Sequence, residues 1–202
     1  MEMEAGGGDI MKKLVATLLL AVMIVSAVGC GSTKGELDHE GAFREFDPDD
    51  TSVYIDDGYT ALISSVENAN MTDAEKQRCA ELRAMAVDAL ELVNRQRTAA
   101  GLPALVWSDE LAVAADVRAN DEMVRSFSHT RPNGSEYWTV NSDIIWGENL
   151  AKGYNTSEGV VAAWMASPTH AANILDAGFV TCGIAIYEDA DGKLYWAQEF
   201  GY

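Results

Sequence analysis

Hydrophobic residues recur at steps of three and four positions from about Thr72 onward, and this spacing is the strongest constraint on the fold. The recurring positions are Cys79, Leu82, Ala86, Leu90 and Val93. Residues at such steps lie on one face of an α-helix, so the pattern predicts a long helix that buries this face. Gly101 follows the pattern and predicts its end, because glycine commonly stands just after the last turn of a helix.

Shorter helices and two strands are predicted farther along the chain. The helices are expected from Ser108 to near Ser126, after Thr156, and from the Ser167-Pro168 pair to Ile174. Two β-rich runs at 180–187 and 194–200 are joined by an acidic turn that contains glycine, which is typical of a hairpin. Helices followed by a hairpin predict an α+β domain, with helices packed on a small antiparallel sheet.

The composition limits the number of domains and the class of partner. The chain has 202 residues, which favours one folded domain with additional segments. It carries 14 Lys and Arg against 32 Asp and Glu, a formal net charge of −18. Proteins that bind nucleic acids present clustered basic residues, and this sequence has no such cluster, so we exclude a nucleic-acid partner.

An export signal precedes the packed region. The positive segment Met11–Lys13 is followed by an apolar run at 14–28, which is shorter than the roughly 20 residues that a spanning helix needs and is typical of a signal peptide. We assign residues 1–29 to this signal, with translation starting at Met11 because the first ten residues carry three acids. The small residues before Cys30 are similar to a bacterial lipobox, which predicts that Cys30 is lipidated and anchors the chain in the membrane. The alternative is plain secretion.

The stretch between the signal and the packed region is acidic. Nine acids and a single base, Arg44, lie between Glu36 and Asp57. Such a run repels itself and stays extended. We therefore predict an acidic tether over residues 30–75 and a folded domain over residues 76–202, at the outer face of the cell membrane or secreted.

Two cysteines remain if Cys30 carries a lipid. In an oxidising compartment an even number of cysteines favours a disulfide, so we predict a bond between Cys79 and Cys182. The alternative is two thiols, because many anaerobic bacteria avoid disulfides.

Two histidines and one acid are the strongest candidates for chemistry. His129 follows a predicted helix, Glu148 comes directly after Gly147, and His170 is the third residue of the short helix that begins at Pro168. Two imidazoles and a carboxylate can hold a divalent metal such as Zn or Mg, and an open fourth position would suit hydrolysis. The same trio could instead form a hydrogen-bonded network that fixes the loops.

Six segments around these residues resemble the CAP superfamily, which contains cysteine-rich secretory, antigen 5 and plant pathogenesis-related proteins, in its bacterial SCP-like branch. The segments are LVNR at 92–95 with GL at 101–102, SHTRP at 128–132, GENLA at 147–151, WMASPTHAANIL at 164–175, GIA at 183–185 and YWAQEF at 195–200. The resemblance implies an α–β–α sandwich around a three-stranded antiparallel sheet, with a central cleft lined by two His and two Glu.

The resemblance assigns His129, Glu148 and His170 to this cleft. The second acid of animal and plant members follows a tryptophan on the third helix, and here the segment 164–167 reads WMAS, without a carboxylate. Three protein ligands and a water would remain for a metal. Glu122, seven residues before His129, is a further candidate as an outer partner of the site.

Two classes of function fit these expectations. The first, which we favour, is a binding module at the bacterial envelope whose ligand is a lipid, a peptide or cell-wall material. The second is a metal-dependent extracellular hydrolase of peptides or cell wall, in which Glu148 acts as a ligand or base.

Overall fold

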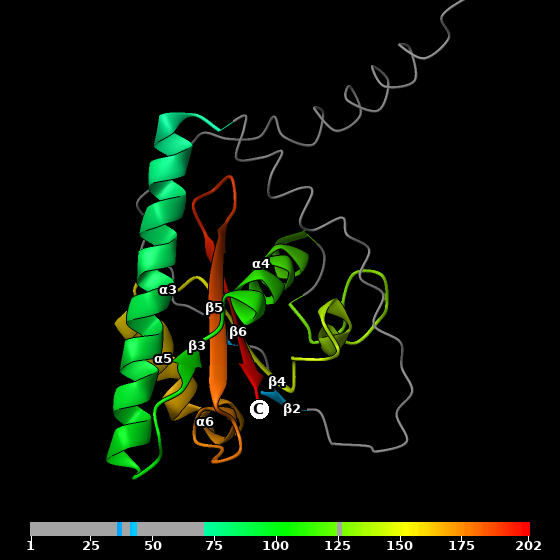
Figure 1. Ribbon diagram of the computed structural model, residues 1–202. Helices are drawn as coiled ribbons and strands as arrows, with labels where there is room; N and C mark the ends of the chain where they lie inside the picture. The colour runs from blue at the N-terminus through cyan, green and yellow to red at the C-terminus, as the bar shows by residue number, and fades with distance from the viewer. Residues whose placement is uncertain (1–35, 38–40, 44–70, 125–126) are drawn as a thin grey trace, which may run out of the picture.

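The computed structural model describes residues 36–37, 41–43, 71–124 and 127–202 (Figure 1). The predicted signal peptide, Cys30 and most of the predicted tether lie outside these residues. Among the helices described, none has the length and apolar character needed to cross a membrane. The elements in chain order are β1 (Glu36–Leu37), β2 (Ala42–Phe43), α3 (Asp73–Ala99), β3 (Val106–Trp107), α4 (Asp109–Val124), the 3₁₀ helix η1 (Tyr137–Val140), β4 (Gly147–Lys152), α5 (Ser157–Ala166), α6 (Pro168–Ile174), β5 (Thr181–Glu188) and β6 (Leu194–Gly201).

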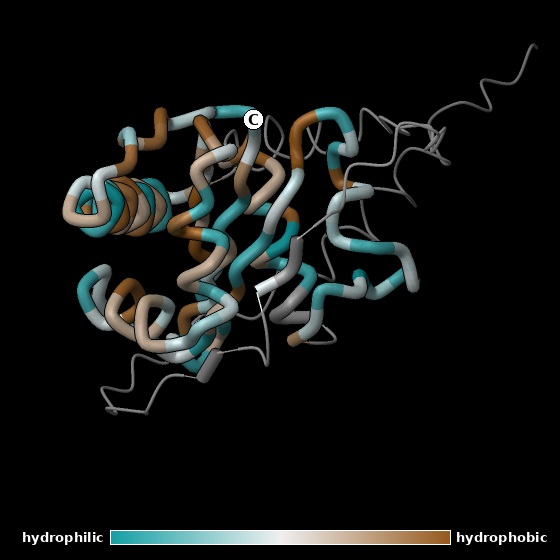
Figure 2. Tube along the Cα trace, turned by 90° about the horizontal axis from the view of Figure 1, so that it is seen from below, coloured by the Kyte–Doolittle hydropathy of each residue, from teal (hydrophilic) through white to brown (hydrophobic). Residues whose placement is uncertain are grey.

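Helix α3 forms where the apolar spacing predicts it. Thr72 and Glu75 make a reciprocal capping box that satisfies free N–H groups at the start of the helix. The helix ends before Gly101, whose φ of 78° lies in the left-handed region that glycine adopts without strain. Seen from below, α3 carries both hydrophobic and hydrophilic residues (Figure 2). Its buried side chains, among them Leu82, Ala86 and Val93, share a core with the sheet.

The sheet corrects the expectation of three antiparallel strands. β4, β6 and β5 are antiparallel neighbours as expected, but β3 adds a fourth strand that runs parallel to β5, so the sheet is mixed. β3 has only two residues, Val106 and Trp107, and a pair of residues carries no periodicity that sequence reasoning could detect. The α+β class itself is confirmed.

Helices cover both faces of the sheet. α3, α5 and α6 share a hydrophobic core with one face, where Trp164 and Trp196 meet edge to face. α4 covers the other face, and its Ala115 and Ala119 pack on β4 and β6. At Gly183 of β5, an added Cβ would collide with the backbone of α4, so this glycine allows the helix to approach the sheet closely.

The predicted disulfide between Cys79 and Cys182 is wrong, because the two cysteines are not bonded to each other. Arg78, the neighbour of Cys79, donates from Nε to Oε2 of Glu188 at 2.7 Å, which places this end of α3 beside the last residue of β5. Cys182 lies near the start of the same strand. A strand rises about 3.3 Å per residue, so Cys182 lies about 20 Å along β5 from Glu188, the residue that Arg78 contacts. A disulfide spans less than roughly 7 Å between Cα atoms.

Two short parts of the predicted tether join the sheet. β1 and β2 both pair in antiparallel fashion with β4, on the edge that β6 leaves open. The predicted boundaries at 29, 75 and 76 stay predictions, and α3 begins at Asp73.

Candidate functional site

Glu148 is the centre of a buried polar cluster between the sheet and α4. It stands on β4 directly opposite Glu199 of β6, and none of its surface is exposed. Arg118 reaches it from α4 with two hydrogen bonds, from Nε to Oε2 at 2.6 Å and from Nη2 to Oε1 at 3.1 Å. Arg118 is also fully buried, so the two groups form a desolvated bidentate ion pair.

The charges of this pair sustain each other. Burial in a medium of low dielectric disfavours the charged forms of both groups. The attraction of Glu148 outweighs that effect and raises the pKa of Arg118 above its ordinary value. Burial alone would raise the pKa of Glu148, but Arg118 and the hydrogen bond with His129 outweigh burial and lower this pKa overall. Glu148 is therefore a carboxylate at neutral pH.

His129 joins the cluster from the turn after α4. Its Nδ1 lies 2.6 Å from Oε1 of Glu148, and 23% of its side chain is exposed. Its ring meets Tyr137 edge to face, with 5.8 Å between the centroids. The carboxylate at Nδ1 fixes the orientation of the imidazole, and part of the ring stays exposed beside the buried ion pair.

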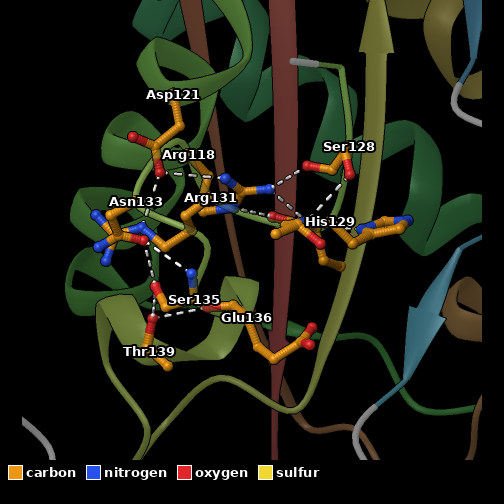
Figure 3. A network of polar contacts seen from close by, with 11 residues as sticks. Arg118, Asp121, Ser128, His129, Arg131, Asn133, Ser135, Glu136 and Thr139 are labelled. Atoms are coloured by element: carbon orange, nitrogen blue, oxygen red, sulfur yellow. Dashed lines mark hydrogen bonds and ion pairs between the residues drawn. The ribbon is translucent and has the colours of Figure 1, made fainter. Parts of the chain in front are cut away.

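The turn that carries His129 is fastened to α4 (Figure 3). Arg118 lies between Asp121 and Ser128, and it donates to the Asp121 carboxylate at 3.1 Å and to the backbone carbonyl of Ser128 at 2.8 Å. Arg131 donates to the same Asp121 oxygen at 2.8 Å. One arginine thus positions both the acid and the backbone beside the histidine.

His170 occupies a different environment. It is fully buried on α6, and its Nδ1 lies 2.7 Å from the hydroxyl of Ser167. Its backbone carbonyl accepts a hydrogen bond from Asn149. Successive side chains of a strand point to opposite faces, so Asn149 projects away from the face that carries Glu148. The structure brings His129 and Glu148 together and leaves His170 in a second polar group with Ser167, in the segment where the resemblance places the second acid.

The side chains around Glu148 do not fit a metal ion. In the part of the chain that the structure describes, no set of three or more His, Cys, Asp or Glu residues is arranged to hold one. Both carboxylate oxygens of Glu148 accept hydrogen bonds from Arg118, and a guanidinium at this distance repels a second cation.

Sequence reasoning missed Arg118, Asp121 and Arg131. A usable signal existed, because Arg118 follows Leu111 and Ala115 at steps of four and three, which places a charged residue on the buried face of a helix. A charge on such a face requires a buried partner. The expected outer partner Glu122 has its side chain outside the described residues, and Asp121 beside it binds Arg118.

Comparison with known families agrees with this architecture. The model of CAP, the Cysteine-rich secretory protein family, matches residues 90–200, which contain His129, Glu148 and His170. The chain belongs to the CAP family. Members need not share one chemistry, because a fold does not fix a function.

Individual relatives share only part of their length with this CAP protein. The uncharacterized protein YkwD of Bacillus subtilis (strain 168) is 35% identical over 117 residues, which are 55% of this chain and 44% of that protein. The chain thus spans less than half the length of this relative. An outer surface protein from Borrelia burgdorferi has the same fold at 22% identity, with a TM-score of 0.50 over 55% of this chain and 87% of that chain. An extracellular SCP-domain protein from Bacillus anthracis is also 22% identical, with a TM-score of 0.49 over 58% of this chain and 40% of that chain.

Proposed function

We propose that this CAP protein is an exported, lipid-anchored module that binds a peptide or cell-wall ligand at the bacterial envelope. Its apolar N-terminal segment and Cys30 support export and anchoring. Two solved structures of similar proteins are described as extracellular or outer-surface proteins, which supports the same location.

One observation carries the preference for binding over metal-dependent hydrolysis. Both oxygens of the Glu148 carboxylate accept hydrogen bonds from Arg118, and Oε1 also lies 2.6 Å from Nδ1 of His129, so a metal would have to compete with a guanidinium for this carboxylate. His129 and Arg131 remain partly exposed above it, at 23% and 20% of their side chains. The imidazole of His129 and the guanidinium of Arg131 can donate hydrogen bonds to the carboxylate and amide oxygens of a peptide or a cell-wall fragment.

The test is a titration of the unlipidated full chain, Cys30→Ala, with soluble peptidoglycan fragments, followed by NMR. We expect shifts centred on residues 127–131 and at least about tenfold weaker binding for His129→Ala, which corresponds to 1.4 kcal/mol. Asp191→Ala, at the exposed tip of the β5–β6 hairpin, is the control and should bind as the parent does.

The same samples also test the alternative function, a metal-dependent hydrolase. Mass spectrometry of the fragments after incubation with and without added Zn²⁺ should find them intact. Zinc-dependent cleavage that disappears in His129→Ala would establish a hydrolase and refute the binding proposal.

A further inference from the structure

The outer edge of β4 is covered by the chain's own N-terminal strands. β4 pairs with β6 on one edge, and on the other edge the register sets Glu36 opposite Lys152, Leu37 opposite Ala151, and Ala42 opposite Glu148. An uncovered strand edge presents unpaired N–H and C=O groups that readily accept another strand. β1 and β2 fill this edge, although they lie outside the region that the family model matches.

Gly41 allows the N-terminal segment to lie in close contact with α6 and β4. A Cβ added at Gly41 would lie 2.7 Å from Oδ1 of Asn149, 2.8 Å from Nδ2 of Asn173 and 2.9 Å from the carbonyl oxygen of Thr169. Side chains do not approach so closely without displacing their neighbours. The backbone at Gly41 therefore rests directly on the two amides, and only glycine allows this position.

The surface beneath Gly41 is built by the domain itself. Nδ2 of Asn173 donates to Oδ1 of Asn149 at 3.0 Å and to the backbone carbonyl of Glu148 at 3.1 Å. Nδ2 of Asn149 donates to Oε1 of Gln198 at 3.0 Å. All three amide side chains are buried and bonded to one another, so the floor is built from residues of β4, α6 and β6.

We propose that the outer edge of β4, with its floor of Asn149 and Asn173, is a binding groove for an extended peptide, and that β1 and β2 occupy it in cis. An added strand gains main-chain hydrogen bonds from the edge, and the close approach at Gly41 selects a peptide with glycine at that position. The register adds a preference for an acid opposite Lys152. The side chain of Asn149 in this floor projects to the face of β4 opposite Glu148, so the groove does not depend on the ligand proposed at the His129 cluster.

The strands in cis are short enough to be displaced. β1 and β2 contribute two paired residues each, whereas β5 and β6 pair over eight. A tethered segment competes at an effective concentration on the order of millimolar, so it masks the groove from a weak external peptide without holding it permanently. Disrupting the close contact of Gly41 with Asn149 and Asn173 should therefore expose the groove.

The test uses the full chain with Cys30→Ala and Cys79→Ser, and a fluorescent synthetic peptide with the sequence of residues 36–43. Gly41→Val should unseat β1 and β2, so hydrogen exchange at the β4 amides should quicken while exchange in β5 and β6 stays as in the parent. The peptide should then bind at least about tenfold more tightly than it binds the parent, because the competing segment has left. The same peptide carrying valine in place of its glycine is the matched control and should not bind.

A second variant tests the groove in the opposite direction. Glu36→Cys with Lys152→Cys places two cysteines at directly opposed positions, and their disulfide should lock β1 on β4 and abolish peptide binding, with recovery on reduction. Unchanged β4 exchange and peptide affinity in Gly41→Val would overturn the proposal, and so would released β4 amides that bind no peptide. His129→Ala should leave this binding unchanged, so failure here does not count against the envelope-binding proposal.

Discussion

Arg118 and Glu148 decide how the candidate site behaves at the level of single residues. Removing two charges from water costs several kcal/mol, and their attraction offsets that cost only while both partners are present. The pair lies between a helix and a strand that are far apart in the sequence, so it fixes α4 on the sheet. Its loss should therefore affect stability as well as the position of His129.

We predict that Glu148→Gln lowers the free energy of unfolding by about 3–5 kcal/mol, because it leaves the Arg118 guanidinium buried without a counter-charge. The double variant Arg118→Met, Glu148→Leu should recover at least half of this loss. Urea unfolding of the single and double variants measures both values, and metal content determined on the same samples should be the same as in the parent.

The control for this prediction is a surface pair of similar geometry. Arg83 and Asp109 are 2.9 Å apart, but their side chains are 63% and 77% exposed. Asp109→Asn should change stability by less than about 1 kcal/mol, since exposed pairs contribute little. A Glu148→Gln variant as stable as Asp109→Asn would contradict the energetic role of the buried pair.

Sequence reasoning found part of the site because His129 and Glu148 stand in recognisable family segments. The assignment of His170 to the same cleft stays a prediction, and the structure places this residue beside Ser167 and Asn149. Sequence reasoning missed Arg118, because the helix pattern was followed through its apolar residues alone. The charged residue on the buried face of α4 could have predicted a guanidinium, and not a metal ion, as the partner of Glu148.

Among the elements, the C-terminal end of α3 is fixed by a single side chain. Arg97 is 1% exposed and donates to four backbone carbonyls, those of Pro103, Ile174, Asp176 and Phe179, at 2.7–3.1 Å. These carbonyls belong to the connection after α3, to the last residue of α6 and to the segment between α6 and β5. One guanidinium thus joins three parts of the chain that have no regular ladder between them.

We expect Arg97→Met to destabilise the domain by about 3–5 kcal/mol, because methionine preserves much of the volume but leaves four backbone carbonyls, two of them in buried hydrogen bonds, without their donor. Arg95→Met, on the exposed side of the same helix, is the matched control and should stay within about 0.5 kcal/mol of the parent. Thermal unfolding of both variants measures the difference. Equal melting temperatures would show that the carbonyls find other partners.

Element prediction succeeded where a segment was long enough to show a period. The spacing from Leu82 to Val93 located α3, and two β-rich runs joined by an acidic turn located β5 and β6. β3 and the cis pairing of β1 and β2 were missed because strands of two residues have no period. The disulfide was predicted from a cysteine count. Such a count contains no information about the length of β5, about 20 Å, that separates Cys182 from Glu188 beside Arg78.

At the scale of the whole molecule, the net negative charge of the chain opposes its proposed attachment to a membrane. The formal net charge of −18 repels an anionic membrane surface, so the chain has no electrostatic means of remaining there. If the protein is held at the membrane as we propose, the lipid predicted at Cys30 must hold it there. The negative charge would hold the domain away from the lipid headgroups while the acyl chains hold the N-terminus in the bilayer.

This arrangement predicts that Cys30→Ala converts a membrane-bound protein into a soluble one. Burial of acyl chains contributes about 0.8 kcal/mol per CH₂ group, and two chains give stable anchoring, so no other part of this acidic protein can compensate for their loss. Phase separation in a mild detergent measures the effect in the bacterial host. The parent should enter the detergent phase and Cys30→Ala the aqueous phase, while Cys79→Ala, which removes a different cysteine, should behave as the parent does. Equal partitioning of the parent and Cys30→Ala would refute the anchor and leave plain secretion as the route to the envelope.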